Sequence, residues 1–462
     1  MRETGDRRIA PISFQVEESS ATRAYLVHVG FRRRPGAVLG SESLILREED
    51  ERLEEAHGLA LAIDLEVQGM ISVILTKATP ATLIGGGKVE EIAAELKELE
   101  VELVVVNASL TPVQQRNLER AWNAKVLDRT GLILEIFGRR ARTREGRMQV
   151  ELAHLTYQKS RLVRSWTHLE RQRGGFGFLG GPGETQIEAD RRVIQDRIVK
   201  IKVELEKVKR RRELHRENRR RVPYPIVALV GYTNAGKSTL FNQLTKAGVL
   251  AENMLFATLD PTMRQLKLPH GRMVILSDTV GFISELPTDL VAAFRATLEE
   301  VLEATFILHV RDISHPESDA QAADVLQVLT TLGLGEERRS HITEIWNKID
   351  LLTPEDRAAV QNQAERRDDV ILVSAVTGEG VPSLLAAVEH RLAEAAKTYS
   401  LSLKGEDGAA LSWLYETGEV LERREAEDGS IALIVRVPAE KSEVLRSRYA
   451  DALSAPVEMP MS

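Results

Sequence analysis

The chain has 462 residues, of which 43% are hydrophobic and 28% charged, the composition of an ordinary globular protein with about three domains. It contains no cysteine, which excludes disulfides, Cys-ligated zinc, iron–sulfur clusters and cysteine nucleophiles, and no apolar run of about 18 residues that would predict a membrane span. The net charge of −7 is unevenly distributed, because the segment from Arg139 to Arg221 has 24 Lys and Arg against 11 Asp and Glu.

The first part of the chain is predicted to hold a flexible tail and a small α/β domain. Residues 1–21 are polar and lack the apolar core of a signal peptide, so we interpret them as the tail of a cytoplasmic protein. Residues 22–138 alternate strand and helix patterns, which predicts a parallel sheet covered by helices. The strands are expected at 25–29, 71–75 and 103–106, and the helices at 48–57, 88–99 and 111–122.

A glycine-rich stretch in this domain, Ile84-Gly85-Gly86-Gly87-Lys88, lies at a predicted strand-to-helix junction. Its spacing is not that of a phosphate-binding loop, which favours a plain turn. The alternative is an anion site, for example for the phosphates of ATP.

Residues 139–222 are predicted to form a basic antiparallel helical hairpin with a glycine-rich tip loop at 174–183. Two segments carry apolar residues with heptad spacing: Met148, Leu152, Leu155, Leu162, Trp166 and Leu169, then Ile194, Ile198, Ile201, Leu205 and Val208. Phe176 and Phe178 in the tip loop could stack on bases or fold back onto the helices, and both alternatives stay open. The excess of basic charge favours nucleic acid as a partner over a merely solvated helix surface.

The next predicted domain, residues 223–397, opens with a phosphate-binding loop, Gly231-Tyr232-Thr233-Asn234-Ala235-Gly236-Lys237-Ser238. It follows the apolar run 226–230 and precedes a helical pattern, which is the context that such a loop needs. Its backbone N–H groups are expected to bind phosphate oxygens. Lys237 would reach the β and γ phosphates of a nucleotide, and Ser238 would bind Mg²⁺.

Three further motifs, each after an apolar strand, indicate that the base is guanine. In Asp278-Thr279-Val280-Gly281, the aspartate would hold Mg²⁺ through water and the Gly281 N–H would contact the γ phosphate. In Asn347-Lys348-Ile349-Asp350, the Asp350 carboxylate can accept from N1–H and the 2-amino group of guanine, which adenine does not offer, and Lys348 would pack along the ring. Ser374-Ala375-Val376 would offer a backbone N–H to guanine O6.

Between the first two motifs, Phe256-Ala257-Thr258-Leu259-Asp260 lies where a switch threonine closes over Mg²⁺ and the γ phosphate. We therefore predict a Mg²⁺-dependent GTPase in which Lys237, Thr258 and Gly281 act in catalysis. Its metal would be held by Ser238, by Thr258 and, through water, by Asp278. Residues 398–462 carry a strand pattern at 431–437 and a helix pattern at 439–449, which predicts a small α+β domain.

Together with Gly181-Pro182-Gly183-Glu184-Thr185-Gln186-Ile187-Glu188, these motifs resemble the HflX family of ribosome-associated GTPases over about residues 22–396. The resemblance implies the domain order predicted above and binding to the RNA of the large (50S) ribosomal subunit. It further implies a role in ribosome splitting, rescue or biogenesis. Phe282 stands where Ras-like enzymes carry a water-positioning glutamine, which implies slow intrinsic turnover. We expect the chain to act as a monomer.

Two alternative functions and a second cation stay open. A nucleotide-gated RNA- or ribosome-binding module would use hydrolysis only to reset binding. A tRNA-modifying GTPase is disfavoured, because those enzymes end in a cysteine-containing motif and this chain has no cysteine. Asn234 occupies a loop position at which some potassium-activated GTPases use an asparagine ligand, so K⁺ is a candidate beside Mg²⁺.

Overall fold

A computed structural model describes the chain over residues 22–31, 49–172, 182–219, 224–246, 255–259, 261–284, 301–302, 304–335, 338, 342–394, 397–404, 407–425, 429–437 and 439–454. The predicted tail lies outside these residues, as do Asp260 and most of the predicted tip loop with Phe176 and Phe178. The described residues divide into two compact units, the first ending at Ile133 and the second beginning at Leu134. Among the described residues, no helix is long and apolar enough to cross a membrane.

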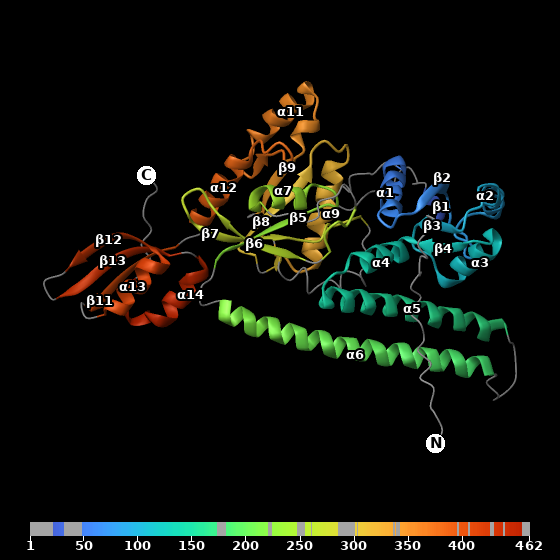
Figure 1. Ribbon diagram of the computed structural model, residues 1–462, viewed down its shortest axis with the longest axis horizontal. Coiled ribbons are helices and arrows are strands. Elements are labelled where there is room, and N and C mark those ends of the chain that lie inside the picture. The colour runs from blue at the N-terminus through green and yellow to red at the C-terminus, as the bar shows by residue number, and fades with distance from the viewer. Residues whose placement is uncertain are drawn as a thin grey trace, which may run out of the picture. The chain divides into compact units, whose positions relative to one another are not determined.

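The first unit is a four-stranded parallel sheet with the order β2-β1-β3-β4 (Figure 1). Its elements are β1 (Arg23–Phe31), α1 (Glu49–Leu61), β2 (Glu66–Leu75), α2 (Gly86–Glu98), β3 (Leu103–Asn107), α3 (Pro112–Trp122) and β4 (Lys125–Asp128). Buried apolar side chains of β1, β3, α2 and α3 form the core, which confirms the predicted α/β architecture. The patterns did not predict β4 or the next helix, α4 (Arg129–Arg140), because β4 contributes only a Val-Leu pair.

The basic segment forms the predicted antiparallel hairpin of α5 (Arg144–Gln172) and α6 (Pro182–Arg219), which run side by side in Figure 1. Arg144 Nη2 donates to Glu204 Oε2 over 3.2 Å, and Arg197 Nε donates to Glu151 Oε1 over 2.7 Å. The partner's number falls on α6 as the residue number rises on α5, as an antiparallel pairing requires.

The heptad pattern of the hairpin is only partly reflected in burial. Met148, Ile198 and Ile201 are buried, whereas Leu152 and Leu155 are half-buried. Pro182 and Gly183, which the sequence pattern predicts in the tip loop, are instead the first residues of α6. The helix begins at Pro182 because proline is favoured at the first helical position, where its missing N–H is not needed.

The second unit contains a six-stranded sheet with the order β10-β9-β8-β5-β7-β6, in which only β6 is antiparallel to its neighbour (Figure 1). Its strands are β5 (Ile226–Gly231), β6 (Thr262–Lys267), β7 (Met273–Asp278), β8 (Phe306–Asp312), β9 (Ile342–Asn347) and β10 (Val370–Leu372). The helical elements are α7 (Lys237–Thr245), α9 (Ser318–Thr331), η1 (Ile349–Leu351), α11 (Pro354–Ala364) and α12 (Val381–Glu394).

The parallel strands of this sheet explain why its motifs converge. Apolar residues of β5, β7 and β8 pack with α7 and α12 in one buried cluster. The strands β5, β7 and β9 end at Gly231, Asp278 and Asn347. Because parallel strands present their carboxyl ends at one edge of a sheet, residues from three distant motifs meet there.

The last described segment is an α+β fold, as predicted, with an antiparallel sheet in the order β12-β13-β11-β14. Its elements are β11 (Lys397–Lys404), α13 (Gly408–Thr417), β12 (Glu419–Glu425), β13 (Ser430–Val437), α14 (Ala439–Arg448), η2 (Ala450–Ala452) and β14 (Leu453–Ser454). Alternate residues of β13 are buried, so that one face of the sheet packs against α13 and α14 in its own core.

Candidate nucleotide-binding site

The loop between β5 and α7 has a backbone that only glycine fits at two positions. Gly231 has a φ of 152°, and a Cβ there would lie 2.2 Å from the carbonyl oxygen of Val310. Gly236 has a φ of 91°, and a Cβ there would lie 2.2 Å from Nδ2 of Asn347. Asn234, between them, is also left-handed at a φ of 61°. This tight loop places the first turn of α7 at the carboxyl ends of the parallel strands, where its backbone N–H groups attract anions.

Lys237 is buried beneath this loop and folds back onto it. Its Nζ donates to the carbonyl oxygens of Gly231 over 3.1 Å and Tyr232 over 2.7 Å. Burial lowers the pKa of Lys237 to about 8, against the opposing effect of the Asp278 carboxylate. A bound phosphate would supply the negative charge that this buried cation lacks.

Ser238, Thr258 and Asp278 come together from three separate segments. Ser238 Oγ donates to Asp278 Oδ2 over 2.7 Å, Thr258 Oγ1 donates to the same oxygen over 3.1 Å, and the two hydroxyls lie 2.8 Å apart. Neighbouring ligands of an octahedral Mg²⁺ lie about 3 Å apart, since each is about 2.1 Å from the ion. The spacing of the two hydroxyls therefore fits direct Mg²⁺ ligands.

Asp278 has an unused oxygen that fits a metal-bound water. It is fully buried, and its Oδ1 has no hydrogen-bond partner among the described residues. Burial raises the pKa of Asp278, although the hydrogen bond from Ser238 and the charge of Lys237 oppose this. A hydrated cation would satisfy Oδ1 and stabilise the carboxylate, so the residues present fit Mg²⁺.

The segment after Asp278 is fastened to the phosphate loop in a way that the motifs did not predict. Thr233 N donates to Phe282 O over 2.7 Å, and Phe282 N donates to Gly231 O over 3.1 Å. Ser284 N donates to the hydroxyl of Tyr232 over 2.8 Å. The only sequence feature that could have indicated these hydrogen bonds is the aromatic residue Tyr232 at the second loop position, where the motif accepts any residue.

Gly281 is constrained by its neighbours rather than by its own φ. A Cβ at this position would lie 2.8 Å from Thr233 Cγ2 and 3.1 Å from Lys237 Nζ. Phe282, the next residue, has a buried apolar side chain, which cannot hydrogen-bond a water molecule. The arrangement brings the Gly281 backbone close to the lysine at the phosphate site.

Within the motif Asn347-Lys348-Ile349-Asp350, the Asn347 side chain is buried, whereas those of Lys348 and Asp350 are accessible. Asn347 Nδ2 donates to Ala235 O over 2.8 Å, and Ala375 N donates to Asn347 Oδ1 over 2.9 Å. Asn347 thus ties the phosphate loop to the loop after β10. Asp350 lies exposed on η1, and Lys348, at a φ of 67°, forms an ion pair with Asp312 over 2.6 Å.

Several other predicted site residues form the framework around the pocket. Thr279 Oγ1 donates to Leu229 O over 2.6 Å, and Ser374 Oγ accepts from Thr377 N over 3.1 Å. The buried members of the predicted set include Val280, Leu259, Ile349, Ser374 and Ala375, whereas Val376 is exposed. The pocket itself is lined by Thr233, Lys237, Ser238, Phe256, Thr258 and Gly281, among others. The arrangement can bind a phosphate chain and a divalent cation at the end of a parallel sheet.

Comparison with protein families matches nearly the whole chain. Four family models match in order: "GTP-binding GTPase N-terminal" at residues 50–138, "GTP-binding GTPase Middle Region" at 140–219, "50S ribosome-binding GTPase" at 226–348 and "HflX C-terminal domain" at 359–457. A GTPase HflX of Magnetococcus marinus is 53% identical over 399 residues, which cover 86% of this chain and 91% of that protein.

A second sequence relative agrees with these matches. The GTPase HflX of Escherichia coli K12 is 44% identical over 392 residues, which cover 84% of this chain and 90% of that protein. A crystal structure of a GTP-binding protein from Sulfolobus solfataricus in complex with GDP aligns over 80% of this chain and 98% of its own, at 22% identity and a TM-score of 0.43. By its sequence relatives and its four matched domains, the chain belongs to the HflX family of GTPases and is a GTP hydrolase.

Proposed function

We propose that this GTPase binds the large (50S) ribosomal subunit and uses its nucleotide state in ribosome splitting, rescue or biogenesis in the cytoplasm. The observation that carries the proposal is the basic hairpin directly before the GTPase sheet. Residues 139–221, which include both helices, carry 24 basic and 11 acidic residues, in a chain whose overall charge is −7. A family model described as "50S ribosome-binding GTPase" also matches residues 226–348.

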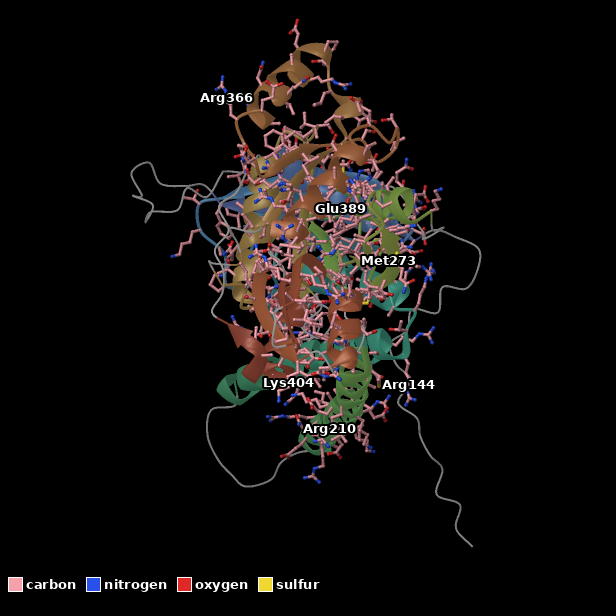
Figure 2. All side chains as sticks on the ribbon, turned by 90° about the vertical axis from the view of Figure 1, so that its left-hand side faces the viewer. Arg144, Arg210, Met273, Arg366, Glu389 and Lys404 are labelled. Carbon is pink, nitrogen blue, oxygen red and sulfur yellow. The ribbon has the colours of Figure 1, made fainter. Side chains whose placement is uncertain are left out.

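The described part of the hairpin presents many of these basic side chains to solvent. Arg144 on α5 and Arg210 on α6 are exposed and stand out from their helices in Figure 2. Further exposed basic residues of α6 are Arg191, Arg192, Lys200, Lys202 and Lys207. Lys and Arg side chains bind nucleic-acid phosphates and release counterions, which makes such binding strong at low salt. The hairpin therefore suits ribosomal RNA.

In this proposal, the site residues have different roles in GTP hydrolysis. The loop N–H groups and Lys237 would bind the β and γ phosphates, and Thr258 and the Gly281 N–H would order around the γ phosphate. Mg²⁺, when bound by Ser238 and Thr258, supplies positive charge to the phosphate oxygens. Because Phe282 cannot orient water, the intrinsic rate is expected to be slow until a partner completes the site.

A second cation is part of the proposal. Asn234, held in a left-handed conformation within the phosphate loop, would contribute an oxygen to K⁺, which would add positive charge near the leaving phosphate. Matched chloride solutions of K⁺ and Na⁺ test this directly. Faster GTP turnover in K⁺ is expected, and equal turnover in both salts would contradict the assignment.

The ribosome role is tested by co-sedimentation with ribosomes in GTP, GDP or a non-hydrolysable GTP analogue. The analogue should retain the protein on 50S subunits, and 50S subunits should accelerate GTP hydrolysis. Loss of the 70S peak would support splitting. Nucleotide-dependent binding with an unchanged 70S peak would instead favour the alternative, a module in which hydrolysis only resets binding. No 50S binding in any nucleotide state would contradict the proposal.

A hairpin variant makes the test specific. Replacing Lys200, Lys202 and Lys207 by Glu reverses three exposed charges on α6 without touching its buried face. Ribosome binding should fall by about tenfold or more at moderate salt, because each lost phosphate contact weakens counterion release. GTPase activity without ribosomes should stay unchanged. The matched control reverses three exposed charges elsewhere, at Lys97 on α2, Arg120 on α3 and Arg366 after α11.

A further inference from the structure

The switch segment that carries Thr258 includes an aromatic residue with an unusual backbone. Phe256 has a φ of 56°, in the left-handed region, which a bulky residue rarely adopts unless its surroundings hold it there. Its side chain is buried, and it lines the nucleotide pocket together with Ala257 and Thr258. The residues that pack against the Phe256 ring therefore fix the position of the switch segment.

The Phe256 ring packs against Phe137 of α4. The ring centroids are 4.8 Å apart and the planes make an angle of 83°, which is the edge-to-face geometry that aromatic rings favour. Phe137 is buried as well. It belongs to the same compact unit as the GTPase sheet, since that unit begins at Leu134, but it comes long before β5, the first strand of that sheet.

The contact lies close to the metal ligands along the chain. Thr258 follows Phe256 by two residues, and its hydroxyl contacts Ser238 and Asp278 at 2.8 and 3.1 Å. Two residues span at most about 7 Å, so the position of Phe256 limits where Thr258 can lie. We propose that Phe137 is a positioning residue for GTP hydrolysis, which acts through Phe256 to hold Thr258 at the metal site.

The main chain around Phe137 is tied to the base of the hairpin. Ala141 N donates to Phe137 O over 2.9 Å, and Arg147 Nε donates to Ala141 O over 3.3 Å. Arg147 belongs to the first turn of α5, which begins at Arg144. If the hairpin binds ribosomal RNA, which rests on the proposed function, a tilt of α5 would reach the switch threonine through these two rings.

The test needs no ribosome, so its outcome is independent of the proposed ribosome role. Single-turnover GTP hydrolysis and binding of fluorescent GDP are measured on the full chain for Phe137→Ala, Phe137→Leu and Ile136→Ala. Phe137→Ala should lower the hydrolysis rate constant about tenfold, the equivalent of about 1.4 kcal/mol. Its GDP affinity should stay within about twofold of wild type, because GDP lacks the phosphate that Thr258 faces.

The two other variants separate positioning from general destabilisation. Phe137→Leu keeps most of the apolar volume and should recover most of the lost rate. Ile136→Ala removes a buried side chain from the same helix and should keep the wild-type rate. A wild-type rate in Phe137→Ala that still binds GDP would overturn the proposal, as would an equal loss of rate in Ile136→Ala.

A double-mutant cycle covers the case in which Phe137→Ala does not fold. Phe137→Val, which keeps less of the apolar volume than Phe137→Leu and should lose a measurable part of the rate, is combined with Phe256→Leu, and the rate losses are compared. If the two residues act through one contact, the double variant should lose little more than the worse single variant. Independent, fully additive losses would show that Phe137 does not act through Phe256, and they would overturn the proposal.

Discussion

Two glycine-rich loops in this chain precede a helix, and they differ in what their glycines do. In the phosphate loop, a Cβ at Gly231 or Gly236 would lie 2.2 Å from a neighbouring atom, and both residues are left-handed. At Gly85, Gly86 and Gly87, a Cβ would meet no atom within 4 Å. The first loop needs glycine because its backbone is crowded, and the second does not.

The lysines that follow the two loops differ in the same way. Lys237 is buried and its Nζ returns to the carbonyl oxygens of its own loop. Lys88 is partly exposed, and its Nζ pairs with Glu91, one turn along α2, over 2.6 Å. Because α2 begins at Gly86, the stretch at residues 84–88 is the start of a helix rather than the predicted plain turn. A phosphate site requires a charge aimed at the loop, so the comparison disfavours an anion site there. It teaches that glycine content alone does not indicate nucleotide binding.

The largest expected effect is on GTP affinity, and it distinguishes Lys237 from Lys88. Lys237→Ala removes a buried cation that would contact two phosphates, and GTP affinity should fall by about a hundredfold or more. Lys88→Ala is the matched control and should leave GTP affinity unchanged. Both are measured by titration with a fluorescent GTP analogue. Retained affinity in Lys237→Ala, or a comparable loss in Lys88→Ala, would break the distinction between the loops.

Base selectivity sharpens the comparison, because only the phosphate loop is joined to a base-recognition segment. Asp350→Asn replaces an acceptor-only carboxylate by an amide, so one guanine donor loses its partner and the preference for GTP over ATP should fall by about tenfold or more. Competition of ATP and GTP for the fluorescent analogue measures the preference. Glu355→Gln, a charge removal in the nearby first turn of α11, serves as the control. An undiminished preference would contradict the assignment of Asp350 to the base.

The fold was largely predictable because central parallel strands such as β1, β3 and β5 are buried on both faces and read as short apolar runs. The valine run of β3 and the run before Gly231 each mark a strand without ambiguity, and the order of strand, loop and helix then locates the phosphate site. The motifs also place the residues that meet at the strand ends. Short strands such as β4, with only Val126 and Leu127 as apolar residues, do not stand out from a turn.

The contacts within the site were less predictable, because a motif specifies residue types along the chain and not their partners. The motif places Asn347 near the base, whereas in the structure its amide bridges Ala235 and Ala375. The pairing of Phe137 with Phe256 joins segments that are far apart in sequence. No local pattern reports such a contact, since it depends on how separate elements pack.

Glycine replacements test whether the backbones of the two loops differ in crowding, through their effect on the free energy of unfolding. Gly236→Ala introduces an overlap with Asn347 and a strained φ, and should destabilise the fold by about 1–3 kcal/mol. Gly86→Ala lies in the first turn of α2 in open space, and should stabilise by about 0.5 kcal/mol, because alanine restricts the unfolded chain. Thermal unfolding of each variant gives the direction. A stabilising Gly236→Ala would show that the loop is less crowded than described.

The smallest expected effect is a dependence of GTP affinity on pH. The pKa of Lys237 is lowered to about 8 by burial in the free site, and bound phosphate would raise it again, so binding takes up a proton when the free lysine is neutral. Affinity should therefore be nearly constant below about pH 7.5 and fall about fourfold between about pH 7 and 8.5. The measurement is the dissociation constant of GTP at constant ionic strength across this pH range. An affinity that does not change over this range would mean that Lys237 is already charged before the nucleotide binds.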